Sequence, residues 1–214
     1  MNITDATYYE RGKKFIPNNN NKNSEVPGVP NVGSELDSLI SEIERPFIIE
    51  LLGIESATEL EVALLDLNNA DQKWKDLVEG VNYTIDTIVY RFDGLRGNNK
   101  ESLLAYYVFC KYMEQDESTY STTGVVRSDA SNAHSFSPSR KYLDCWYLFL
   151  NAYQNKTSAN NPIVFERNGI LGIDYYGQKR KGGLVTLETF LTDHEEDYVD
   201  FHIERHETKN SLGI

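Results

Sequence analysis

The chain has 214 residues, with 21 basic and 33 acidic side chains and a formal net charge of -12. A chain of this length buries roughly 70% of the surface that its unfolded form exposes, so it needs neither metals nor disulfides to fold. A mean hydropathy of -0.51 and the lack of a long apolar run exclude a transmembrane helix, and no secretory signal is expected from the first residues. The acidic balance argues against a protein whose main task is to neutralise nucleic-acid phosphates.

Residues 1–33 are expected to form an extended N-terminal arm and linker. The Asn-rich run at 17–23 and the Pro- and Gly-containing residues 27–30 lack the apolar side chains that a packed element needs. Ahead of this linker lie four large side chains that we expect to bind a partner, namely Tyr8, Tyr9, Phe15 and Ile16. The other interpretation is a frayed terminus that happens to carry aromatic residues.

The next region, residues 34–155, has the pattern of a helical body. Apolar residues recur at three- and four-residue spacings from 36 to 52, which predicts a helix that ends at Gly53. Pro46 interrupts this run, so the helix either kinks there or divides into two. Further helices are expected after Ser56 and around Trp74. Residues 34–95 contain four basic and fourteen acidic side chains, so much of the acid is concentrated here.

Three further segments of this body have recognisable patterns. Residues 81–92 are rich in Thr, Tyr, Ile and Val, which fits a strand, although a helix is also consistent with them. Residues 103–114 are apolar on nearly every side, as in a central buried helix. A last helix is expected to begin at Pro138, because proline suits the first helical position. Cys110 and Cys145 both fall in apolar helical patterns and are interpreted as buried small hydrophobes in a reducing compartment.

A long excursion separates the last two helices of the body. Residues 118–137 are twenty residues rich in Ser, Thr, Gly and Asn, and such a loop is unusual inside a compact domain. We therefore predict a hairpin-like insertion that pairs with a neighbouring subunit through main-chain hydrogen bonds. The predicted interface residues of this excursion are Thr123, Gly124, Val125, Val126 and Arg127.

Residues 156–214 are predicted to form a β-rich extension. Short apolar runs alternate with turn residues, and residues 199–203 alternate apolar and polar side chains as a half-buried strand does. A basic hairpin tip carries Lys179, Arg180 and Lys181, which could contact an acidic neighbouring copy or nucleic acid, or could be a solvated loop. The fold class expected for the whole chain is mainly α, a helical bundle with a hairpin-like insertion and a small C-terminal antiparallel β region, and α+β overall.

The sequence contains no recognisable catalytic signature. His194, His202 and His206 lie among acidic residues near the C-terminus, and a metal site can be imagined there. However, His202 and His206 would share a face only in a helix, whereas the surrounding alternation favours a solvated strand. No HExxH motif and no Gly-rich phosphate loop occurs. No metal, cofactor or catalytic residue is therefore expected.

One stretch of sequence resembles a known family. Residues 123–127, Asn132-Ala133 and the run from Ser137-Pro138 to Tyr142, followed by a helix that contains Trp146 and Tyr153, form a pattern similar to that of head-tail connector proteins of tailed bacteriophages. The resemblance is to the neck-ring, or head-completion, adaptors of crAss-like gut phages in particular. It covers roughly residues 34–155.

The resemblance implies a structural virion protein rather than an enzyme. Such a protein is made in the bacterial host cytoplasm and forms a homo-oligomeric ring, expected to be a dodecamer, in the phage neck. Its partners would be copies of itself, the portal protein, further neck or tail proteins, and DNA that passes through the lumen without specific binding. An acidic lumen would repel DNA phosphates, although acid on the outside would serve solubility equally well. The alternatives are a metal-dependent enzyme that uses the His/Asp/Glu-rich C-terminus and a cytoplasmic binding module.

Overall fold

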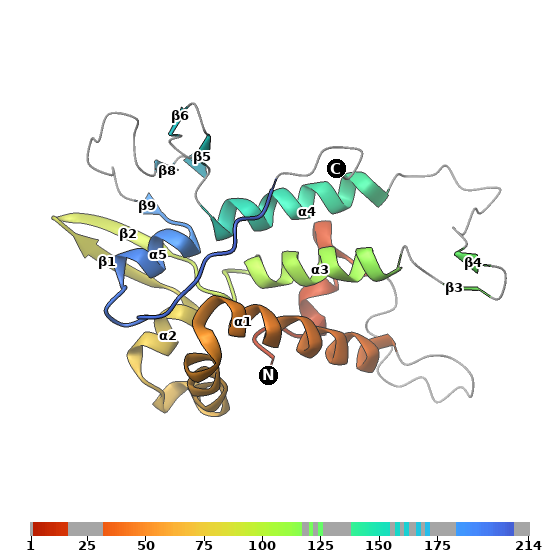
Figure 1. The fold of residues 1–214 in the computed structure, drawn as a ribbon, viewed down its shortest axis with the longest axis horizontal. Coiled ribbons are helices and arrows are strands. Elements are labelled where there is room, and N and C mark those ends of the chain that lie inside the picture. Colours follow the sequence, from red (N-terminus) through yellow and green to blue (C-terminus); the bar gives the residue numbers. More distant parts are fainter. Residues whose placement is uncertain are drawn as a thin grey trace.

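A computed structural model describes residues 2–16, 32–116, 138–154 and 183–207, together with short strands between residues 120 and 171. The described chain is mostly helical with a small mixed sheet, so the predicted α+β class is confirmed (Figure 1). Within the described ranges, no helix is both long and apolar enough to cross a membrane. The helices are α1 (Val32–Leu65), α2 (Gln72–Glu79), α3 (Leu103–Asp116), α4 (Pro138–Tyr153) and α5 (Leu187–Asp193), with 3-10 turns η1 (Ala6–Tyr9), η2 (Gly12–Lys14) and η3 (Leu67–Asn69).

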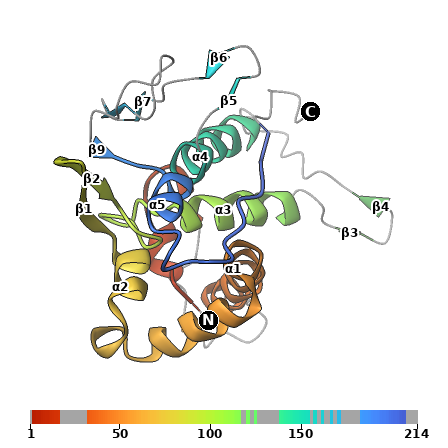
Figure 2. The ribbon, with the colours of Figure 1, turned by 60° about the vertical axis from the view of Figure 1, so that its left-hand side comes forward.

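Helices α1, α3 and α4 form the bundle, with α3 between the other two in both views (Figures 1 and 2). Helix α3 is buried on almost every side, as its sequence predicts, and Leu104, Val108 and Cys110 are fully enclosed. Its first turn is capped by Ser102, whose hydroxyl accepts a hydrogen bond from the Ala105 amide at 3.1 Å. Helix α4 begins at the predicted proline.

Helix α1 changes direction at Gly53 and not at Pro46. The proline removes one backbone hydrogen bond, but its φ suits a helix, and it lies on the exposed side of α1. Gly53 has φ 77° and ψ 164°, a conformation that a helix cannot contain and that glycine adopts most readily. The second half of α1 therefore leaves the bundle and runs toward α2 (Figure 2).

The sheet is built around a hairpin, so residues 81–92 are strand and not helix. Strands β1 (Val81–Ile85) and β2 (Ile88–Phe92) pair antiparallel, and β9 (Gly183–Leu184) adds to β2 in parallel. Three short antiparallel pairs complete the strands: β3 (Tyr120–Ser121) with β4 (Gly124–Val125), β5 (Thr157–Ser158) with β6 (Asn161–Pro162), and β7 (Glu166–Arg167) with β8 (Ile170–Leu171).

Between residues 157 and 171 the described strands pair antiparallel, as predicted, but from residue 183 onward the C-terminal region differs from the predicted antiparallel extension. Residues 187–193 form a helix, and Phe190 packs its ring parallel to that of Phe92 with 4.3 Å between centroids. Residues 198–207 form a strap instead of a strand: residues 198–200 turn, and residues 201–207 then run across the bundle. The His202 amide donates to the Leu51 carbonyl at 2.7 Å, and the Gln154 amide group donates to the His206 carbonyl at 2.7 Å. The hydrogen-bond partners of the strap are thus a carbonyl of α1 and a side chain after α4, and not a neighbouring strand.

The described part of the N-terminal segment is not an extended arm. Residues 2–16 pack against the bundle, and Tyr9 and Ile16 are buried in the same core as the helices. The Ile16 amide donates to the Tyr9 carbonyl at 2.9 Å, which closes the segment on itself. The predicted docking of Tyr9 and Ile16 on a partner is therefore wrong, because the chain's own helices cover both side chains.

A buried carboxyl group holds this segment in place. Glu44 of α1 accepts hydrogen bonds from the amides of Ile3 at 2.6 Å and Thr4 at 3.0 Å, and from the Thr4 hydroxyl at 2.5 Å. Burial disfavours the charged form more strongly than these donors favour it, so the pKa of Glu44 is raised from 4.5 to about 7. The folded chain therefore retains a proton in a pH range where the unfolded chain releases it.

Replacement of Glu44 should reveal this linkage. The raised pKa stabilises the fold fully below pH 4.5, and that stabilisation is lost as the pH rises to about 7. Relative to Glu44→Gln, the wild-type free energy of unfolding should fall by about 3 kcal/mol between pH 4.5 and pH 8. Urea titrations at several pH values measure this difference. Parallel pH profiles for the two proteins would contradict the assignment.

The loop after β2 fixes α2 to the sheet by backbone-to-backbone contact. The amides of Leu95 and Arg96 donate to carbonyls of Leu77 and Val78 in α2, both at 2.9 Å. Gly94, with φ 77°, lies directly against Gly80, and a Cβ on Gly94 would be 2.4 Å from the Gly80 nitrogen. Neither backbone has room for a side chain, so the position of α2 depends on this glycine.

Gly94→Ala should therefore destabilise the fold by roughly 2–4 kcal/mol, because a steric clash adds to the cost of a left-handed alanine. Gly12→Ala is the matched control, since Gly12 has the same φ of 77° but open space around the added Cβ. It should cost only about 1 kcal/mol. Thermal and urea denaturation report both values, and equal losses would show that the close approach is unimportant.

Candidate partner-binding groove

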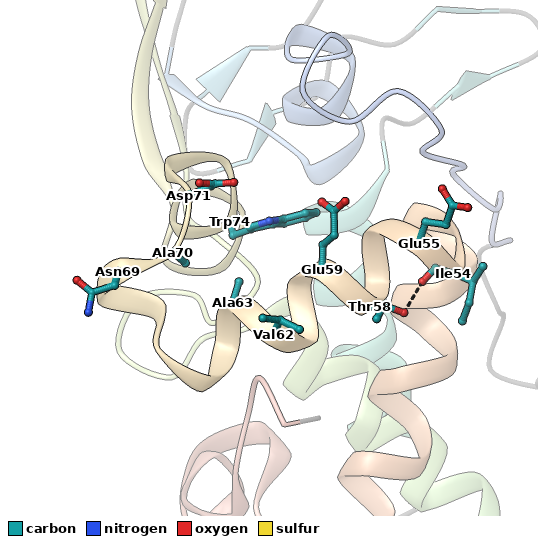
Figure 3. Close-up of a pocket in the computed structure, with 10 residues that line it drawn as sticks. All are labelled: Ile54, Glu55, Thr58, Glu59, Val62, Ala63, Asn69, Ala70, Asp71 and Trp74. Carbon is teal, nitrogen blue, oxygen red and sulfur yellow. Dashed lines mark hydrogen bonds between the residues drawn. The ribbon is translucent and has the colours of Figure 1, made fainter.

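An open groove of about 710 Å³ lies between the second half of α1 and the η3–α2 segment. Figure 3 shows side chains from both walls around it, with Trp74 reaching from α2 toward Glu59 of α1. The lining residues are Ile54, Glu55, Thr58, Glu59, Val62, Ala63, Asn69, Ala70, Asp71 and Trp74. The groove exists because Gly53 turns the second half of α1 out of the bundle.

Apolar side chains of α1 are exposed in this groove and one turn beyond it. Ile54 is 56% exposed and Val62 is 65% exposed, and Leu65, which follows one turn later, is 86% exposed. These positions and Thr58 recur at three- and four-residue spacings, so they form one stripe on the helix. We call Ile54, Val62 and Leu65 the apolar stripe.

Carboxylates border the apolar stripe. Glu55 and Glu59 project from α1 to the same side of the groove, and Asp71 precedes α2 on the other wall (Figure 3). Lys73 compensates part of this charge, because its Nζ lies 3.4 Å from a carboxylate oxygen of Glu59. The groove therefore combines apolar walls with an acidic rim, which suits a partner with an apolar or aromatic group next to basic ones.

The α2 wall is held from behind by the C-terminal strap. The Tyr198 hydroxyl donates to the Lys73 carbonyl at 2.5 Å, and its ring packs edge-on to Trp74 at 6.1 Å between centroids. On the groove side, Lys73 Nζ lies 4.5 Å from the centre of the Trp74 ring. These contacts place Trp74, itself almost fully buried, at the base of the groove.

The structure describes only some of the interface residues predicted from the sequence. Phe15 is 43% exposed and Tyr8 is half-buried, whereas Tyr9 and Ile16 belong to the core. Gly124 and Val125 form β4, and nothing is described of their side chains. The other predicted residues, Thr123, Val126, Arg127, Lys179, Arg180 and Lys181, lie outside the described residues.

The three C-terminal histidines lie in different surroundings, and His202 is exposed. His206 sits among the rings of Trp146, Phe149 and Tyr153, at 5.3 to 5.6 Å between centroids. His194 instead packs against Phe190 at 4.5 Å, and its Nδ1 lies 2.9 Å from the carbonyl of the same residue. In the part of the chain that the structure describes, no three His, Cys, Asp or Glu side chains are grouped as a metal site requires.

The groove was not predicted from the sequence, although the sequence contains a signal for it. Helical spacing places Leu60 and Leu64 on one face of the second half of α1, and it places Val62 and Leu65 on another face. A second apolar face on an acidic helix is a sign of a contact outside the chain. The sequence indicates that acidic side chains are concentrated in this region, but it does not indicate that they border a groove.

Comparison of the chain with protein families, with curated proteins and with solved structures finds no match.

Both cysteines should be unreactive in the folded chain. Cys110 and Cys145 are fully buried, and burial raises the pKa of the Cys145 thiol to about 12. At pH 8 the native protein should react with a thiol reagent such as DTNB more than about a hundredfold more slowly than the urea-unfolded protein, since only the thiolate attacks. Rapid labelling of Cys145 at low denaturant would show that α4 opens locally.

Proposed function

We propose that this chain is a structural subunit of a ring in the neck of a tailed bacteriophage, where it joins the portal to the tail or to a further ring. Two lines of support come together. The pattern in residues 123–153 resembles that of head-tail connector proteins, and the groove between α1 and α2 has the character of a protein-binding surface.

The apolar stripe is the observation that carries the proposal. Three aliphatic side chains lie largely in water on one helix face, at 56%, 65% and 86% exposure. Burial of such a side chain against a partner contributes roughly 1.5–3 kcal/mol before ordering costs are subtracted. In a ring the same contact recurs at every subunit, so a modest energy per contact stabilises the whole assembly.

The excursion at residues 118–137 would add a second contact in this proposal. A hairpin-like insertion that carries Thr123 to Arg127 would reach a neighbouring subunit or the next ring, where main-chain hydrogen bonds provide affinity. The basic residues Lys179, Arg180 and Lys181 would meet the acidic surface of another copy. Both assignments rest on the sequence.

The charge of the chain fits a subunit that surrounds passing DNA. A net charge of -12 repels phosphates, so DNA can move through a lumen lined by such subunits without sticking. The portal protein and further neck or tail proteins would be the partners above and below the ring.

The same groove also favours a second candidate function, a binding module that takes a basic, partly apolar segment of another cytoplasmic protein. The two functions differ in where the chain accumulates. A neck subunit is a stoichiometric part of purified virions, whereas a binding module remains in the lysate.

Imaging of purified particles tests the proposal. A label fused to the chain should appear at the neck in a ring, and particles assembled with Val62→Ser plus Leu65→Ser should contain about tenfold less of the protein, because the apolar stripe is lost. Folding stability should change by less than about 0.5 kcal/mol, since both side chains are exposed. Quantitative mass spectrometry of virions and thermal denaturation measure the two effects.

Val89→Ser is the matched control for this experiment. Val89 is also an exposed valine, but it lies on β2, away from the groove. This variant should enter particles as the wild type does. Virions that lack the chain altogether would refute the neck assignment, and normal incorporation of the double variant would remove the groove from it.

A further inference from the structure

A second surface, distant in sequence from the groove, has the opposite charge. It is formed where η2 lies beside α4: the Lys13 Nζ is 3.8 Å from a carboxylate oxygen of Asp144, and the Lys141 Nζ donates to the Phe15 carbonyl at 2.7 Å. We call this surface the basic aromatic face. It comprises exposed or half-exposed residues of η2 and its two caps and of the α4 stripe beside it, namely Arg11, Lys13, Phe15, Arg140, Lys141 and Tyr147, together with the paired Asp144.

The aromatic residues of this face point outward for a local reason. Phe15 follows η2 with an extended backbone, φ -64° and ψ 124°, so consecutive side chains point to opposite sides. Ile16 therefore enters the core while Phe15 stays 43% exposed, with Lys141 Nζ 5.7 Å from its ring centre. Tyr147, which is 38% exposed, lies on the same stripe of α4 as Arg140 and Asp144.

Exposed aromatic side chains surrounded by arginine and lysine are typical of the anchors of protein interfaces. The groove presents what such an anchor requires, because its apolar walls can enclose a ring and Glu55 and Asp71 can pair with basic side chains at its rim. The two surfaces are therefore complementary in polarity and in charge, and they belong to different elements of one chain.

We propose that the basic aromatic face of one copy docks on the acidic groove of the next copy, with Phe15 inserted between α1 and α2. The inference rests on the proposed ring function and assigns the two surfaces that make its subunit contact. The occupant of the groove is thus a second copy of this chain.

The symmetry of such a contact agrees with a ring. A groove that binds a different surface of an identical neighbour makes a head-to-tail contact, and each copy has one of each surface to offer. Such contacts generate a closed ring when the rotation between neighbours closes, whereas a contact of the groove with itself would stop at a dimer.

Charge reversal on either surface tests the pairing in the full-length chain. The groove variant carries Glu55→Lys and Asp71→Lys, and the face variant carries Arg11→Glu and Arg140→Glu. All four side chains are exposed, so folding should be preserved, as far-ultraviolet circular dichroism and melting will show. By sedimentation velocity, each variant alone should require about a tenfold or higher concentration to self-associate, because like charges then face each other.

An equimolar mixture of the two variants should associate as the wild type does, since a basic groove then meets an acidic face and an acidic groove meets a basic face. Glu42→Lys with Glu196→Lys is the matched control: it changes the net charge as the groove variant does, at exposed positions of α1 and of the segment after α5. It should leave association unchanged.

Three outcomes would overturn the pairing. The first is that either variant alone self-associates as strongly as the wild type. The second is that the mixture of the two variants does not recover association, and the third is that the wild type remains monomeric at every concentration tested. A groove variant that fails while the face variant assembles normally would assign the groove to a different partner. None of these results decides the neck function, which virion imaging determines separately, so failure of the pairing and failure of the proposed function are distinguishable.

Discussion

The left-handed backbone of Gly53 divides α1 into two parts with different roles. The first part packs against α3 and contributes Ile40, Ile48 and Leu51 to the core, whereas the second part turns toward α2 and exposes the apolar stripe. The Leu51 carbonyl lies two residues before the break, and the His202 amide of the strap donates a hydrogen bond to it. A single residue in a conformation that other residues rarely adopt therefore creates the groove beside the attachment point of the strap.

The sequence predicts an element well where its own residues carry a strong signal. The prediction fails where the element is held by residues that are remote in the sequence. Helix α3 is apolar on all sides, and α2 ends at a glycine, so both follow from their own residues. The hairpin of β1 and β2 has a weak signal, because its turn residues Asp86 and Thr87 both have positive φ without the glycine that usually marks such a turn. Residues 2–16 are held by Glu44, some forty positions away, and no local pattern shows that.

The candidate site likewise has a part that local sequence predicts and a part that depends on remote contacts. Helical periodicity alone can predict the apolar stripe, because Val62 and Leu65 fall outside the face that Leu60 and Leu64 define. That this stripe borders a groove depends on α2, which is fixed by the approach of Gly94 to Gly80 and by bonds from the loop after β2. The alternation at residues 199–203 predicts a strand, but residues 199 and 200 lie in a turn, in which the Phe201 amide donates to the Tyr198 carbonyl. The partners that hold this segment are remote in sequence: the Leu51 carbonyl of α1 bonds to His202, and Trp146 of α4 bonds to the Glu207 carbonyl.

The strap sets an order of events during synthesis of the chain. Both walls of the groove depend on residues near the C-terminus, since His202 holds the end of the bundle part of α1 and Tyr198 holds α2 through the Lys73 carbonyl. A ribosome that has released only the helical body has therefore not yet produced a finished groove. Neighbouring nascent chains cannot recognise one another through this surface before residues 198–202 of each have been synthesised, which protects the acidic groove from premature partners.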